Sequence, residues 1–99
     1  MIVRIATESQ YRLDDDVAAR LNELDNEAVA AVEAGDEARF HELFGQMLQM
    51  VTDGGAPVDD EELVVSQVII PPRDLTFEEA KAEFTGEGLI PEDGGPNSA

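Results

Sequence analysis

Cysteine and tryptophan are both absent from this 99-residue chain, and histidine occurs once, as His41. The lack of cysteine excludes disulfides, thiol catalysis and thiolate metal sites. A Ser-His-Asp arrangement would need His41 to meet Ser9 or Ser66 by chance of folding, because the sequence has no nucleophile-elbow motif. Neither glycine pair, 54–55 or 94–95, follows a predicted strand, so neither predicts a phosphate-binding loop. The sequence therefore predicts no enzyme activity and no cofactor.

Basic residues are scarce. Six lysines and arginines stand against 23 aspartates and glutamates, for a formal net charge of −17. Direct contact with DNA, RNA or anionic lipid needs a basic stripe, which this composition argues against. The complementary expectation is a positively charged protein partner. The same charge favours solubility and destabilises the compact state through self-repulsion.

Long apolar runs are also missing. The nearest candidate, VVSQVII at residues 64–70, has the length of a strand and falls far short of the roughly 18 apolar residues of a membrane span. Residues 1–4 do not begin an apolar run of the kind found in signal peptides. We therefore expect a cytoplasmic protein that does not bind membranes directly.

The side chains of the first residues fall into two alternating sets, one of which is apolar throughout. Residues 1–6 and 10–13 alternate on either side of a polar break at 7–9. Alternation with a period of two is typical of half-buried strands, so this stretch predicts a β-hairpin.

Two amphipathic helices are predicted next. Asp14 and the two acids after it favour a helix start, Gly35 fits the C′ position, and Asp36 fits the next N-cap. Apolar residues of the first helix recur at spacings of three and four: Val17, Leu21, Leu24, Ala28, Ala31 and Val32. The second helix has a wider apolar stripe, of roughly 160°: Phe40, Leu43, Phe44, Met47, Leu48, Met50 and Val51. Glycines at 54–55 end it, and residues 56–62 are predicted to form a loop.

A strand and a short helix are predicted after this loop. Residues 64–70 are rich in β-branched side chains, most clearly at 67–70, and Pro71 stops the strand. Thr76 and Glu79 match a capping box, which predicts a short helix that stops at Gly86.

Together these elements predict one α+β domain over residues 1–91. A small β-sheet, made of the N-terminal hairpin plus one later strand, packs against the αα-hairpin, with the short C-terminal helix beside them. Leu89 and Ile90 are expected to fold back as an apolar anchor. Residues 92–99 contain glycine, proline, asparagine and serine, and are predicted to be a disordered tail.

Four segments carry a family resemblance. They are MIVRIATESQYRL at 1–13, AVEAGDEARF at 31–40, DDEELVVSQVIIPP at 59–72 and EFTGEGLIP at 83–91. In that order and at those distances they resemble the PspA-associated protein family, PspAA, small bacterial proteins encoded beside the membrane-stress protein PspA. Ser9 stands where glycine is common in the family, so the type of the hairpin turn stays open.

The resemblance implies a role rather than a reaction. It implies a non-enzymatic accessory or regulatory protein that binds PspA in the phage-shock response to envelope stress. PspA is a coiled-coil, membrane-remodelling protein of the ESCRT-III-like superfamily. The resemblance thus implies that the chain reaches the inner face of the membrane only through this partner.

Three acidic or methionine-containing features are candidates for partner binding. The first helix carries like charges at i,i+4, the second carries methionines in its wide stripe, and the predicted loop carries four consecutive acids. The candidate residues are Glu23, Glu27, Met47, Met50, Asp59, Asp60, Glu61 and Glu62. Each feature also has a simpler interpretation: a solubility feature, a helix that contacts both the sheet and its neighbour, and a solvated loop. Metal binding is not expected, because the acids at 14–16 lack the spacing of a calcium loop.

Two other functions stay open alongside PspA binding. The chain can be a self-associating acidic scaffolding protein, which would form a homo-oligomer without PspA, or a nucleic-acid mimic suggested by charge alone. Arg4 and Arg12 lie on one face of the predicted hairpin, where they either pair with nearby carboxylates such as Glu8 or mark a less acidic patch.

Overall fold

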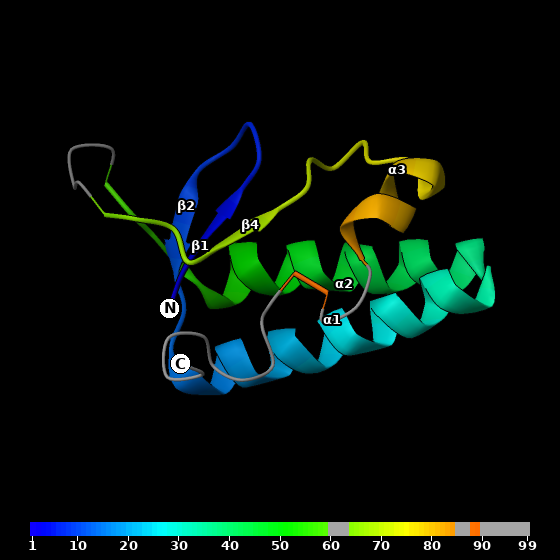
Figure 1. The fold of residues 1–99 in the computed structure, drawn as a ribbon. Helices are drawn as coiled ribbons and strands as arrows, with labels where there is room; N and C mark the ends of the chain where they lie inside the picture. Colours follow the sequence, from blue (N-terminus) through cyan, green and yellow to red (C-terminus); the bar gives the residue numbers. More distant parts are fainter. Residues whose placement is uncertain (60–63, 85–87, 90–99) are drawn as a thin grey trace, which may run out of the picture.

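The computed structural model describes residues 1–59, 64–84 and 88–89. Within these residues the chain forms four strands and three helices, an α+β arrangement as the sequence predicts (Figure 1). In chain order the elements are β1 (Ile2–Ile5), β2 (Gln10–Arg12), α1 (Asp15–Ala34), α2 (Glu37–Gly54), β3 (Ala56–Pro57), β4 (Val68–Ile70) and α3 (Phe77–Glu83).

The sheet is mixed and has the strand order β3-β2-β1-β4. Strand β1 pairs antiparallel with β2, where Val3 lies opposite Tyr11. On its other side β1 pairs parallel with β4, where Val3 lies opposite Val68. The predicted hairpin and the later strand that joins it are both confirmed.

Strand β3 is a feature that the sequence analysis missed, because residues 56–62 were expected to form a loop. Ala56 and Pro57 pair with β2, and the backbone N–H of Val58 donates to the carbonyl of Gln10 at 3.0 Å. Helix α2 ends beside β2, so the short extended stretch that follows the helix can pair with β2. Pro57 is tolerated because β3 is an edge strand, where a proline need not donate to a neighbour.

The hairpin turn between β1 and β2 places a non-glycine residue in the left-handed region. Thr7 has φ 67°, while the backbone N–H of Ile5 donates to the carbonyl of Ser9 at 3.2 Å. The residue of this turn with positive φ is therefore Thr7 and not Ser9. A β-branched side chain in this conformation is strained.

The helix ends follow the predicted capping residues. Asp14 and Asp36 each accept a hydrogen bond from a backbone N–H three residues later, and Gly35 has φ 72° in the C-cap position of α1. Thr76 and Glu79 form the reciprocal capping box that begins α3. These local signals fix where the αα-hairpin turns and where α3 starts.

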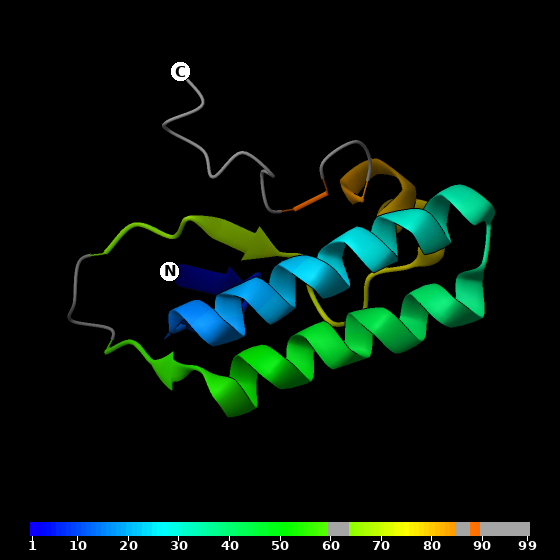
Figure 2. The ribbon, with the colours of Figure 1, turned by 90° about the horizontal axis from the view of Figure 1, so that it is seen from below.

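Helices α1 and α2 run side by side beneath one face of the sheet, and α3 lies past the end of β4 (Figures 1 and 2). The core between these layers takes Val3 and Ile5 from β1 and most of the predicted stripes of both helices. Phe40 lies in its aromatic part, with ring centroids 5.1 Å from Phe84 and 5.9 Å from Phe77. Helix α2 thus contacts α1, α3 and β3, which accounts for the width of its apolar stripe.

The end of the described chain returns to α1. Leu89 packs against the core, and its backbone N–H donates to Oδ1 of Asp25 at 3.0 Å. The expected apolar anchor is therefore present at Leu89. Ile90 and the predicted tail at 92–99 lie outside the described residues.

Candidate functional site

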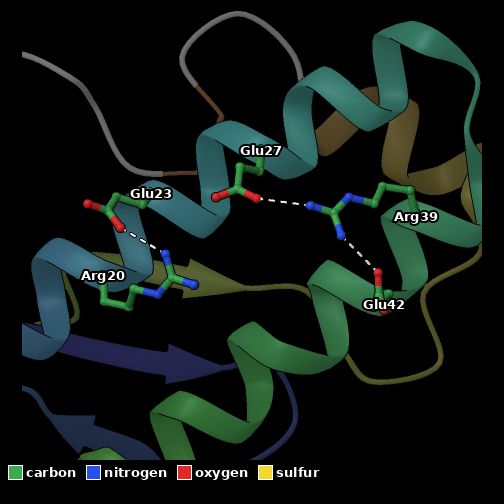
Figure 3. Close-up of polar contacts among 5 residues, drawn as sticks. All are labelled: Arg20, Glu23, Glu27, Arg39 and Glu42. Carbon is green, nitrogen blue, oxygen red and sulfur yellow. Dashed lines mark hydrogen bonds and ion pairs between the residues drawn. The ribbon is translucent and has the colours of Figure 1, made fainter.

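The two glutamates proposed on α1 are exposed, and each forms an ion pair. Glu23 Oε1 lies 2.8 Å from Arg20 Nη1, and Glu27 Oε1 lies 3.2 Å from Arg39 Nη2, which comes from α2 (Figure 3). A second nitrogen of Arg39 contacts Glu42 at 2.9 Å. The repulsion expected between Glu23 and Glu27 is therefore balanced inside the molecule and does not by itself require a basic partner.

Arg20 has an acidic residue on either side of it along α1. Asp16 precedes it by four residues, but the Arg20 guanidinium bonds Glu23, three residues later. Both side chains are about half exposed or more, at 50% for Arg20 and 64% for Glu23. Exposed pairs of this kind contribute about 0–1 kcal/mol, so these ion pairs leave the surface free to rearrange on binding.

The two methionines proposed on α2 separate in the structure. Met47 has no exposed surface and belongs to the core, so it is not available as a surface contact for a partner. Met47 lies near the centre of the apolar stripe, about 20° from Phe40 at 100° per residue, whereas Met50 lies at its edge. Met50 is partly buried and remains within reach of a partner.

Met50 lies in a shallow groove of about 400 Å³ between α1 and α2. The groove is lined by Arg20, Leu24, Gln46, Gln49, Met50, Asp53 and Gly54. Glu23 does not line the groove itself, but it bonds Arg20, which does. Glu27 lies one helical turn further along α1 and faces Arg39 instead.

The acidic run is only partly described. Asp59 is exposed and follows β3, the edge strand at the opposite side of the sheet from β4. Asp60, Glu61 and Glu62 lie outside the described residues. Asp59 is not among the residues that line the groove between α1 and α2.

Asp25 is a buried acid that the sequence analysis missed. It is fully buried in α1, and a Cβ built on Gly88 would lie 2.7 Å from both of its carboxylate oxygens. Gly88 has φ 79°, so this close approach and this backbone conformation both require glycine. The signal was an acid four residues after Leu21 and three before Ala28, inside the apolar stripe.

Arg4 of the hairpin and Arg73, which follows β4, both contact Glu8. Arg4 donates to the backbone carbonyl of Glu8 at 3.0 Å, and the Glu8 carboxylate lies 2.7 Å from Arg73 Nε. The hydrogen bond to Glu8 raises the pKa of Arg73 above its usual value. The expected contact of Arg4 with Glu8 therefore exists, but through the backbone.

His41 is not part of a cluster of possible metal ligands in the described part of the chain. His41 is exposed on α2, and its nearest carboxylate is Glu37, with 3.7 Å between Nε2 and Oε2. Across residues 1–59, 64–84 and 88–89, no three acidic or histidine side chains gather as metal ligands would.

The helices of the described residues can also be compared with a membrane span in length and hydropathy. None of the described helices has the length and apolar character needed to cross a bilayer.

Comparison with known proteins gives one match. The model of the PspA-associated protein family, PspAA, matches residues 1–92, which is all but the last seven residues of the chain. The curated proteins gave no match, and the solved structures gave none either. On the family match, which spans every described element of the fold, the chain belongs to the PspA-associated protein family.

Proposed function

We propose that this domain is an accessory protein that binds a PspA-like coiled coil in the bacterial phage-shock response. The observation that carries the proposal is membership of the PspA-associated family over residues 1–92. The family description itself points to association with PspA. The described residues supply a surface on which such an association can be built.

The proposed surface is the groove between α1 and α2. Met50 and Leu24 give it an apolar floor, and Asp53 and the Arg20–Glu23 pair give it a charged rim. A helix of the partner that lies along this groove would place its apolar residues on Met50, as helices do in helix-in-groove recognition. Methionine suits such a surface because its side chain adapts to different shapes.

Charge would guide the encounter. Residues 14–54, which contain both helices, include eleven acidic and two basic side chains. Both basic residues, Arg20 and Arg39, are already paired with glutamates of the hairpin. A basic stretch on the partner would therefore meet a surface of complementary sign, which speeds association more than it strengthens the final complex.

The proposed role is regulatory and depends on the partner for its place in the cell. A chain of charge −17 is repelled by an anionic membrane surface, whereas a PspA-like protein acts at such surfaces. We therefore propose that the domain is cytoplasmic and that PspA recruits it to the inner face of the membrane.

Binding kinetics with purified PspA, from a genome that encodes both proteins, test the apolar part of the proposal. Met50→Ala should raise the dissociation rate by about 5- to 10-fold, because it removes the apolar anchor of the groove. Val65→Ala is the matched control, since Val65 is 85% exposed and lies outside the helical hairpin. Equal effects of the two changes would reject the groove as the binding surface.

The charged part is tested in the same assay. The double change Glu23→Gln and Glu27→Gln should slow association and weaken its salt dependence, with little effect on dissociation. Glu78→Gln is the control, because Glu78 is also exposed and also paired, with Lys81 at 3.1 Å. Absence of any complex at about 50 µM would defeat the proposal as a whole and favour the self-associating scaffold, which sedimentation of the protein alone would then test.

A further inference from the structure

A second and larger groove lies between the end of β4 and α3. It has a volume of about 600 Å³. Its floor is apolar and is made by Ala6, Ile69, Pro72, Leu75 and Ala82, among others. It shares no lining residue with the groove between α1 and α2, so it is a separate surface.

Ile69 is the apolar residue that this groove leaves open to solvent. Its neighbours Val68 and Ile70 point into the core, and the alternation of the strand turns Ile69 to the other face of the sheet, where it is 58% exposed. Among the described residues, Val65 is the only other large apolar side chain that is exposed. Residues 64–72 contain no charged residue, which is unusual in a chain with 23 acids. Ile69 extends the apolar floor of the groove to the surface, and a contiguous apolar patch of this kind favours interaction with another molecule.

The rim of the groove is acidic. Glu79 and Glu83 lie at i,i+4 on one side of α3 and both line the groove. Glu79 Oε1 accepts a hydrogen bond from the backbone N–H of Thr76, whereas the Glu83 carboxylate forms no hydrogen bond or ion pair with the described part of the chain. Lys81, the one base of α3, bonds Glu78 instead. Two like charges beside an apolar floor are best balanced by a cation from outside.

We propose that this groove binds a basic amphipathic segment of another protein, with an apolar side chain on Ile69 and lysine or arginine beside Glu79 and Glu83. The apolar contact supplies the anchor, and the two carboxylates set the register of the segment. The site is independent of the proposed PspA contact on the helical hairpin, so either can fail without the other.

A second copy of this chain fits the groove less well. Both copies would carry a charge of −17, and the chain has only six basic residues to offer. Five of them already bond to acceptors within the fold: Arg4, Arg20, Arg39, Arg73 and Lys81. The last residues of the chain are no better suited, because Glu92 and Asp93 would add negative charge beside Glu79 and Glu83.

Nuclear magnetic resonance titration with a designed peptide tests the proposal. The probe is a helical peptide of leucine and lysine, about 14 residues long, and its partner probe has glutamate in place of lysine. With the basic probe, amide shifts should change most at Ile69, Leu75, Ala82 and Glu83. The acidic probe should bind at least about 10-fold more weakly, as expected for recognition by charge.

Matched variants locate the contact. Ile69→Thr should weaken the basic peptide by about 5-fold or more, which is the order expected for loss of one apolar anchor. Val65→Thr should leave binding unchanged, since Val65 lies outside the groove. Glu83→Gln should weaken binding and lower its salt dependence, while Glu33→Gln, an exposed acid on α1, should not.

Several results would overturn the proposal. These are shift changes centred on α1 and α2, equal effects of Ile69→Thr and Val65→Thr, and equal binding of the acidic peptide. A dimer in sedimentation that Ile69→Thr dissolves would make a second copy the occupant. Tighter peptide binding after truncation at residue 91 would identify the chain's own last residues as the occupant.

Discussion

At the scale of single residues, the strain at Thr7 is the clearest departure from local preference. A left-handed conformation costs a non-glycine residue about 1–2 kcal/mol, and Thr7 adopts it with φ 67°. The turn that joins β1 to β2 imposes this conformation, because Glu8 donates back to the carbonyl of Ile5 at 2.8 Å.

Thr7→Gly should therefore stabilise the domain by about 1 kcal/mol, less the entropy that glycine gains in the unfolded chain. Urea denaturation monitored by circular dichroism measures this change. Ser9→Gly, two residues away and without positive φ, should be neutral or destabilising. A gain at position 9 and none at position 7 would contradict this account of the turn.

Interactions between residues close in sequence were predictable, whereas interactions between distant residues were not. The caps at Asp14, Gly35 and Thr76 were predictable because each acts on a backbone group within a few residues. The partner of Asp25 lies 64 residues later, at Leu89, and no local pattern connects the two. Met47 was misplaced as a surface contact for a related reason: periodicity gives its angle on the helix, but the depth of burial depends on what packs above it.

At the scale of elements, the strands were less predictable than the helices. Strand β3 has two residues, too few for any periodicity, and exists because α2 ends beside β2. The contact between Arg39 and Glu27 likewise depends on how the two helices lie against each other. Both grooves are formed between elements, so the sequence supplied candidates such as Met50 but could not place them in a common surface.

The contact of residues 88–89 with Asp25 of α1 gives a prediction at the scale of elements. Gly88→Ala should destabilise the domain by about 1–3 kcal/mol, because the new Cβ would meet the Asp25 carboxylate and the backbone has φ 79°. Gly45→Ala is the control, since nothing lies within 4 Å of a Cβ there, and it should stabilise α2 by about 1 kcal/mol.

Chemical denaturation of both variants decides the matter. Should Gly88→Ala unfold at the same denaturant concentration as the original protein, residues 88–89 would contribute little to stability. The contact of residues 88–89 with Asp25 would then not be needed to hold the fold together.

At the scale of the whole molecule, charge is the dominant property. Raising salt from about 20 mM to 300 mM screens repulsion over distances beyond about 6 Å. Thermal unfolding should therefore shift to higher temperature with salt, because a charge of −17 destabilises the compact state.

The same charge should keep the isolated domain off anionic vesicles. Sedimentation with phosphatidylglycerol vesicles at physiological salt should leave the protein in the supernatant, and added PspA should carry it into the pellet. Strong sedimentation without PspA would mean that the described surface has an affinity for lipid that its composition does not explain.

The position of β1 between β2 and β4 has a consequence for synthesis on the ribosome. β1 and β2 can pair early, but β4 begins 66 residues after β1 and is made long after it. Until then one side of Ile2–Ile5 is an open strand edge, the kind of surface that pairs with other chains. We therefore expect the nascent protein to be prone to aggregation through this edge of β1 while the two helices are being made, until β4 pairs with it.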